Sequence, residues 1–236
     1  MTIPSDIARG FTLRLQAVFG GDLAAVILYG SAVRGAYRKN VSDINILVIL
    51  EKSSPAKIFE LGQKTGALMR RRRIVPLIMT RKEFASSADV FPMEYGDILE
   101  ARSVLFGDER ILDISLSRAN LRLQLEEKLR GAVQDIRSML GCAAGRRRLL
   151  GKFFVGWSGI GGSLPRALLR LKGIERTPPD AEALLARVEA EYGVSTRGFA
   201  DLNRFRQGEK LPPLDLAESL LESLKALTEI VDGETA

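Results

Sequence analysis

The sequence predicts an α+β domain with a mixed β-sheet, followed by an all-α helical bundle. Short apolar runs typical of buried strands occupy residues 24–29, 42–50, 74–79 and 103–106. Stretches with helical spacing of apolar residues separate these runs, and after residue 112 only helical patterns remain. We therefore expect two domains, residues 1–112 and residues 113–236.

The first two helices of the α+β domain have local start and stop signals. Ser5 can cap a first helix that ends near residues 20–21, where two glycines follow each other. Ser54 and Pro55 have the residue types of an N-cap and a first helical residue. The helix that they start runs into four arginines at residues 70–73.

The segment after these arginines predicts a strand and two short helices. Pro76 lies within the apolar run 74–79, and because proline donates no backbone hydrogen bond we expect an edge strand or a strand that ends early. Thr80 and Glu83 have the spacing of a capping box, in which each side chain satisfies a backbone N–H of the other residue. Pro92 is expected to start the next helix.

The second domain is predicted to be an antiparallel bundle, because its helices are joined by short connections. A long helix presents an apolar stripe, and a second helix is expected from residue 146 to residue 172, with Gly173 as its C-cap. Asp180 and Gly193 delimit a third helix. Two further helices follow towards residue 230. The stripe on the long helix consists of Leu125, Leu129, Val133, Ile136 and Leu140.

One stretch of the first domain, residues 26–50, combines glycine, serine and acidic residues with two strand-like runs. Gly30 and Ser31 interrupt the first run, and Asp43 and Asn45 lie at the start of the second. Side chains on a strand alternate between faces, so Asp43 and Asn45 are expected on the same face. A polar pair at the start of an apolar strand is costly to bury unless a ligand or a partner binds it.

This stretch resembles the signature of the nucleotidyltransferase superfamily, the DNA polymerase β-like fold of kanamycin nucleotidyltransferase and the minimal nucleotidyltransferases. The residues that match in type and spacing are Gly30-Ser31, Arg34-Gly35 and Ser42-Asp43. The resemblance extends to the architecture, since in the kanamycin type a helical bundle follows the α/β domain and helps to bind the acceptor.

The resemblance implies transfer of a nucleoside monophosphate from a Mg²⁺-bound NTP to an acceptor hydroxyl. In such a site glycine lets the backbone approach the triphosphate, and two strand carboxylates hold divalent ions. Oxygen ligands of this kind suit Mg²⁺. The implied metal ligands are Asp43 and Asn45, and the implied nucleotide contacts are Gly30, Ser31, Arg34 and Ser42.

Two departures from the family pattern bear on catalysis. Asn45 stands where the family has its second Asp, and residues 74–79 contain no Asp or Glu to serve as the third carboxylate and general base. Glu94, Asp97 and Glu100 follow at spacings that share one helix face. We interpret them as a solvent-exposed acidic face, with Glu94 as the best candidate for a replacement catalytic carboxylate.

The composition of the chain indicates which partners it favours and excludes some kinds of catalytic base, metal ligand and disulfide. Lys and Arg exceed Asp and Glu by 35 to 29, so anionic partners are favoured, though weakly. The absence of histidine removes imidazole bases and histidine metal ligands, and the single Cys142 excludes an internal disulfide. The chain has neither a signal-peptide pattern nor a membrane-spanning apolar run, so we expect a soluble cytoplasmic protein.

Two arginine runs and a group of glycines could in principle form binding sites. The arginines at 70–73 and 146–148 are interpreted as solvated or packed helix residues rather than a nucleic-acid surface, since aromatic residues do not interleave with them. Nucleic acid is therefore an alternative partner that we do not favour. The glycines between residues 156 and 162 match no phosphate-loop pattern and are interpreted as positions of close helix packing or of a kink near Pro165.

Two functional hypotheses follow. The first is an active nucleotidyltransferase with Asp43 on the metal, Asn45 as a neutral ligand and an acceptor that the sequence does not name. The second is a catalytically degenerate relative that binds a nucleotide, RNA or a protein partner. Replacing a carboxylate by Asn removes negative charge from a site that has to hold two dications, which favours the second hypothesis for present-day chemistry.

Overall fold

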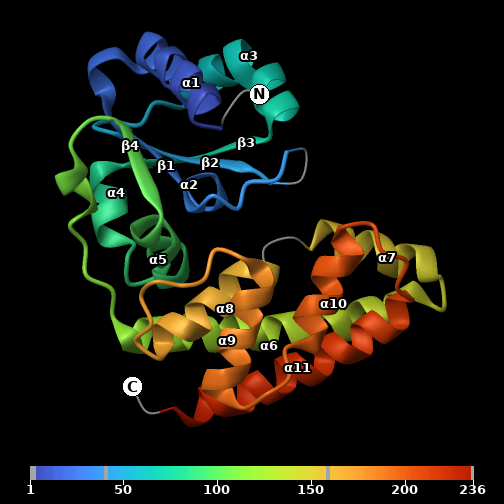
Figure 1. The fold of residues 1–236 in the computed structure, drawn as a ribbon. Coiled ribbons are helices and arrows are strands. Elements are labelled where there is room, and N and C mark those ends of the chain that lie inside the picture. The colour runs from blue at the N-terminus through green and yellow to red at the C-terminus, as the bar shows by residue number, and fades with distance from the viewer. Residues whose placement is uncertain (1–3, 40–41, 158–159, 235–236) are drawn as a thin grey trace. The chain divides into compact units, whose positions relative to one another are not determined.

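A computed structural model describes residues 4–39, 42–157 and 160–234 of the chain (Figure 1). The chain divides into two compact units. The first comprises Met1–Val90 with Tyr95–Leu116, and the second comprises Phe91–Glu94 with Ser117–Ala236. The first unit contains the sheet and the second is helical, which confirms the predicted fold class. The domain boundary predicted at residue 112 stays a proposal.

A four-stranded mixed sheet forms the centre of the first unit, in the order β3-β2-β1-β4. The strands are β1 (Leu23–Tyr29), β2 (Ile44–Leu50), β3 (Ile74–Thr80) and β4 (Arg102–Phe106). β2 pairs parallel with β3, whereas β1 pairs antiparallel with both β2 and β4. β3 is an edge strand, as the position of Pro76 predicted.

Helices cover both faces of this sheet (Figure 1). Even-numbered residues of β2 pack on one face into a core shared with α1 (Pro4–Phe19) and α3 (Pro55–Arg72). Leu47 and Ile49 face the opposite core, which includes residues of α4 (Arg81–Ser86) and α5 (Pro92–Glu100). Burial on both faces explains why the strands are continuous apolar runs rather than alternating ones.

Several local predictions in the first unit are confirmed and two are wrong. α1 begins at Pro4, so Ser5 lies within the helix and is not its N-cap. Ser54 caps α3 by accepting a hydrogen bond from the Lys57 N–H, and Thr80 and Glu83 form the expected capping box of α4. β2 begins at Ile44 rather than at residue 42. Ser42 instead bonds back to Arg38, and neither Ser42 nor Asp43 pairs in the sheet.

The second unit consists of six helices within its described residues. They are α6 (Arg118–Ala143), α7 (Arg147–Gly156), α8 (Ile160–Leu171), α9 (Ala181–Tyr192), α10 (Arg197–Arg206) and α11 (Pro213–Gly233). Their apolar faces form one continuous core, in which the predicted stripe residues Leu125, Leu129, Val133 and Ile136 are buried. No helix in the described ranges is long and apolar enough to cross a membrane.

The single helix predicted for residues 146–172 is wrong, because the structure divides it in two. α7 ends at Gly156, and the N–H of Trp157 donates to the Phe153 carbonyl at 2.9 Å as the C-cap contact. The last residue of α7 is a glycine, and the entropic cost of ordering glycine weakens a helix. Pro165 is accommodated inside α8.

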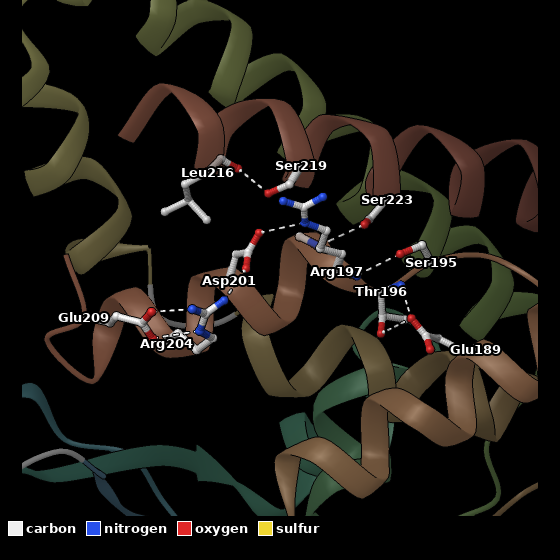
Figure 2. A network of polar contacts seen from close by, with 11 residues as sticks. Glu189, Ser195, Thr196, Arg197, Asp201, Arg204, Glu209, Leu216, Ser219 and Ser223 are labelled. Atoms are coloured by element: carbon white, nitrogen blue, oxygen red, sulfur yellow. Dashed lines mark hydrogen bonds and ion pairs between the residues drawn. The ribbon is translucent and has the colours of Figure 1, made fainter. Parts of the chain in front are cut away.

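α10 is anchored by polar contacts to the helices on either side of it (Figure 2). At its start, the backbone N–H and the hydroxyl of Thr196 donate to Glu189 of α9 at 2.7 and 3.1 Å. Two residues later, the N–H of Gly198 donates to the hydroxyl of Ser223 of α11 at 3.2 Å. A Cβ atom at Gly198 would lie 2.4 Å from the Ser219 carbonyl oxygen, so this close helix crossing requires glycine.

Candidate functional site

The residues singled out by the sequence lie at one end of the sheet in the first unit. Strand register places Tyr29, the last residue of β1, opposite Asn45 on β2 and Arg102 on β4. Asn45 is in turn opposite Val75 on β3. Because β2 and β3 are parallel and both antiparallel to β1, the segments before β2 and β3 lie at the same end as the turn after β1.

Gly30 forms this turn and requires the conformational freedom of glycine. Its φ of 78° and ψ of −143° are outside the regions open to other residues. The Gly30 N–H donates to the Ala101 carbonyl at 2.9 Å, and its carbonyl accepts from the N–H groups of Val33 and Arg34 at 3.0 Å each. A Cβ at Gly30 would lie only 3.2 Å from Nδ2 of Asn45, so the Asn45 amide lies directly beside the turn.

Ser31 is the first residue of α2 (Ser31–Arg34) and is partly exposed. Its carbonyl accepts from the N–H groups of Gly35 and Ala36, which closes this short helix. Ser42, just before Asp43 and β2, is bonded to Arg38. Its N–H donates to the Arg38 carbonyl at 2.8 Å, and its hydroxyl accepts from the Arg38 N–H at 3.0 Å. Ser42 therefore has a structural role in shaping the approach to Asp43.

Asp43 is paired with Arg73, which follows the last residue of α3. Nη2 of Arg73 lies 2.8 Å from Oδ1 of Asp43, and the two side chains are 46% and 38% exposed. The backbones are also joined, since the N–H of Ile44 donates to the Arg73 carbonyl at 2.8 Å. The carboxylate that the sequence places on a metal ion is thus already in contact with a cation.

Asn45 and Val75 occupy neighbouring positions on one face of the sheet. Residues of β2 and β3 that are opposite in parallel register share a face, as Leu47 and Leu77 do in the core below them. Val75 is 49% exposed. The position on β3 from which a third carboxylate would reach the side of Asn45 therefore holds an uncharged valine.

A family model for the nucleotidyltransferase domain matches residues 13–105. These residues form a nucleotidyltransferase domain. The matched range contains the whole Gly30–Asn45 stretch and all of β1, β2 and β3. The resemblance inferred from the glycine, serine and aspartate pattern is confirmed.

The fold of the chain is similar to that of a solved adenyltransferase. Spectinomycin adenyltransferase AAD(9) from Enterococcus faecialis, solved with ATP and spectinomycin, matches with a TM-score of 0.62 at 11% identity. The match covers 97% of this chain and 99% of that chain. A mutant of the toxin-antitoxin MntA-HpeT matches over 55% of this chain and 98% of that chain, with a TM-score of 0.34 and 17% identity. No curated protein matches the chain significantly.

In this nucleotidyltransferase domain Arg34 makes a buried ion-pair cluster. Its Nη2 lies 3.0 Å from Oε2 of Glu100 and 3.3 Å from Oδ1 of Asp97. The Arg34 and Glu100 side chains are each 9% exposed, and Asp97 is 22% exposed. The expected solvent-exposed acidic face is therefore wrong for these two carboxylates, which instead join α5 to α2. The nucleotide contact expected of Arg34 stays a prediction.

Glu94 lies at the start of α5, in the segment that belongs to the helical unit. Its Oε2 accepts a hydrogen bond from Nε2 of Gln124 at 2.8 Å, and Oε1 of Gln124 accepts from the Met93 N–H at 2.8 Å. These bonds lie within the helical unit and join its Phe91–Glu94 segment to α6. The suggestion that Glu94 replaces the missing catalytic carboxylate stays a prediction.

The residues of the nucleotidyltransferase domain do not fit a pair of magnesium ions. Asp43 directly precedes β2 at this end of the sheet, and Arg73 is in contact with it. The Asn45 amide brings no charge, and Val75 brings no oxygen. Across the described residues, no group of three or more histidine, cysteine, aspartate or glutamate side chains is arranged to hold a metal ion. Two dications placed here would repel each other and Arg73 without sufficient negative charge to offset the repulsion.

Proposed function

We propose that this protein binds a nucleoside triphosphate at the Gly30–Ser31 turn and does not transfer the nucleotide. The turn has the backbone conformation that admits close approach of a ligand, because Gly30 has no Cβ. The Ser31 hydroxyl is partly exposed and makes no hydrogen bond with another described residue. These features support retention of the nucleotide-binding part of the domain.

The Asp43–Arg73 ion pair is the observation that carries the second half of this proposal. Nucleotidyl transfer needs charge compensation of the triphosphate and a group that accepts the proton of the attacking hydroxyl. Of Asp43, Asn45 and Val75, Asp43 alone carries a carboxylate, and its charge is offset by Arg73. Neither Asn45 nor Val75 can accept a proton at neutral pH. Binding without turnover is the chemistry that this set of residues supports.

Active nucleotidyl transfer is the second candidate function. The similarity to spectinomycin adenyltransferase extends over nearly the whole chain, which favours an arrangement of a nucleotide domain and an acceptor-binding helical domain. In that reading residues 113–236 would bind the acceptor, Asp43 would hold Mg²⁺ with Asn45 as a neutral ligand, and Glu94 would be the base. We place either activity in the cytoplasm, where nucleoside triphosphates are available.

Ligand-induced thermal stabilisation tests the binding half of the proposal. ATP and GTP at millimolar concentration are expected to raise the melting temperature of the wild type, since a ligand that binds only the folded state stabilises it. Ser31→Ala should reduce this shift. Ser53→Ala, which removes an exposed hydroxyl from the loop before α3, is the matched control and should retain it. Equal shifts in the wild type and Ser31→Ala would contradict the proposed site.

Pyrophosphate release tests the proposal that the protein does not transfer the nucleotide. Each labelled NTP is incubated with the protein, Mg²⁺ or Mn²⁺, and candidate acceptors that include spectinomycin. We expect no release above the protein-free rate. Rapid release that Asp43→Ala abolishes would overturn the proposal and establish the second candidate function.

A further inference from the structure

The backbone at Arg73 is in a conformation that disfavours a side chain. Its φ of 53° and ψ of 43° are left-handed, at the helix C-cap position where glycine is usual. Among the described residues, Ala144 at the end of α6 is the other non-glycine residue with positive φ, at 46°. Arg73 is held there by hydrogen bonds from its N–H to the carbonyls of Arg70 and Met69, and from the Ile44 N–H to its own carbonyl.

This backbone position directs the guanidinium towards Asp43. One terminal nitrogen, Nη2, contacts the Asp43 carboxylate, while the side chain remains 46% exposed. A guanidinium has five N–H donors, so donors remain for a ligand after the Asp43 contact. Asp43 is followed two residues later by Asn45, whose amide lies beside the Gly30 turn. The guanidinium, the carboxylate and the turn are therefore consecutive along one end of the sheet.

We propose that the Arg73 guanidinium replaces the divalent cation of this nucleotidyltransferase domain, so that the protein binds the triphosphate of a nucleotide without a metal ion. This inference rests on the proposed function. A cation tethered to the chain beside Asp43 excludes a dication from the same carboxylate by repulsion. A planar guanidinium also presents paired donors that match phosphate oxygens. Asp43 then acts as a positioning residue for Arg73.

The first test is the metal dependence of nucleotide binding. ATP is titrated calorimetrically into the wild-type protein in EDTA and again in excess Mg²⁺. We expect affinities within about threefold of each other, because the protein supplies the cation. Binding that occurs with Mg²⁺ and disappears in EDTA would overturn the inference while leaving nucleotide binding without turnover intact. Absence of binding in both buffers would overturn both proposals.

The second test removes the guanidinium without straining the backbone. Arg73→Gly should lower the affinity for ATP in EDTA by about tenfold or more, as expected for loss of charge-assisted hydrogen bonds. Arg71→Ala removes an exposed arginine from the last turn of α3 and controls for net charge. Ala144→Gly controls for glycine at a left-handed helix end. Both controls should bind ATP as the wild type does.

The third test uses Mn²⁺ alone, without nucleotide. If Arg73 occupies the place of the metal, Arg73→Gly combined with Asn45→Asp should bind Mn²⁺ detectably by electron paramagnetic resonance, and the wild type should not. Arg73→Lys keeps the charge and should still exclude Mn²⁺, which guards against a folding defect in the glycine variant. Mn²⁺ binding to the wild type equal to that of the double variant would contradict the inference.

Discussion

Arg34 and Glu100 form an ion pair in which both side chains are withdrawn from solvent, with 3.0 Å between Nη2 and Oε2 and 9% exposure on each side. The residues are 66 positions apart in the sequence. Their contact, together with that of Arg34 and Asp97, attaches α5 to the short helix that follows the Gly30 turn. The helix after the Gly30 turn is therefore held in place by these ion pairs as well as by its contacts with the apolar core.

Removal of Arg34 should destabilise the protein strongly. Arg34→Ala removes the cation that contacts the Glu100 and Asp97 carboxylates, and breaking a buried pair in this way typically costs about 3–5 kcal/mol. Arg38→Ala removes an exposed arginine from the following loop and should change the free energy of unfolding by less than about 0.5 kcal/mol. Urea unfolding of both variants measures the difference. A loss below about 1 kcal/mol for Arg34→Ala would show that the pair is solvated in solution.

A side chain at Gly198 should disrupt the crossing of α10 and α11. The Cβ of alanine would lie 2.4 Å from the Ser219 carbonyl oxygen and 2.5 Å from the Leu220 Cα, and neither backbone atom can move without separating the helices. We expect Gly198→Ala to lower stability by about 3 kcal/mol, at the upper end of overpacking effects. Thermal unfolding followed by circular dichroism measures this.

Gly131→Ala is the matched control for that experiment. Gly131 is exposed within α6, and a Cβ there meets no atom within 4 Å. Alanine should stabilise the helix by about 0.5–1 kcal/mol through its higher helix propensity. Similar effects of the two substitutions would contradict the close packing at Gly198.

Asn45→Asp should give nucleotide binding a Mg²⁺-dependent component without creating an efficient enzyme. The substitution restores a second carboxylate beside the Gly30 turn and therefore a site with more negative charge for a divalent ion. Turnover should stay negligible, since Val75 still offers no proton acceptor. Calorimetric titration of Mg²⁺-ATP and an assay of pyrophosphate release measure the two effects.

Two further variants sharpen that test. Asp43→Ala should abolish any Mg²⁺-dependent component of binding. Asn45→Asp combined with Val75→Glu completes a set of three carboxylates and is the variant in which slow nucleotidyl transfer is expected. If the wild type already transfers nucleotides and Asn45→Asp changes nothing, another carboxylate must serve as the base, with Glu94 the first to examine.

Titration of the Tyr95 hydroxyl should make the stability of the protein fall as the pH rises through the alkaline range. Tyr95 is 1% exposed, its hydroxyl donates to the Phe84 carbonyl at 2.6 Å, and burial raises its pKa to about 12. Below the ordinary value of 10 the hydroxyl is protonated in both the folded and the unfolded chain. Between pH 10 and about 12 the unfolded chain releases this proton first, so stability falls as pH rises.

Tyr95→Phe tests this dependence. At pH 7 the variant should lose about 1–2 kcal/mol, because the buried Phe84 carbonyl loses its donor. Above pH 10 its stability should fall less steeply with pH than that of the wild type. Other groups that titrate in this range are present in both proteins and therefore do not affect the difference between them. Parallel pH curves for the two proteins would show that Tyr95 titrates normally.

Local sequence signals were sufficient to predict the class of fold and the family of the first domain. The strand runs, the proline in the edge strand, the Ser54 cap and the Thr80–Glu83 capping box depend on residues a few positions apart. The Gly30-Ser31 and Ser42-Asp43 pairs belong to the same class of signal, because each is a short segment with its own backbone requirement. Asn45 was equally visible, and it already indicated a site short of negative charge.

Only the tertiary structure decided what the charged side chains contact. The residues next to Asp43 in the sequence do not indicate that Arg73, the last arginine of the run 70–73, contacts its carboxylate. The residues next to Arg34 likewise do not indicate that it forms ion pairs with Asp97 and Glu100. The position of Val75 beside Asn45 likewise depends on the parallel register of β2 and β3. Ion pairs and strand register join residues that are 30 or more positions apart, so they are set by how the helices and strands pack, and the pattern of any one segment does not contain them.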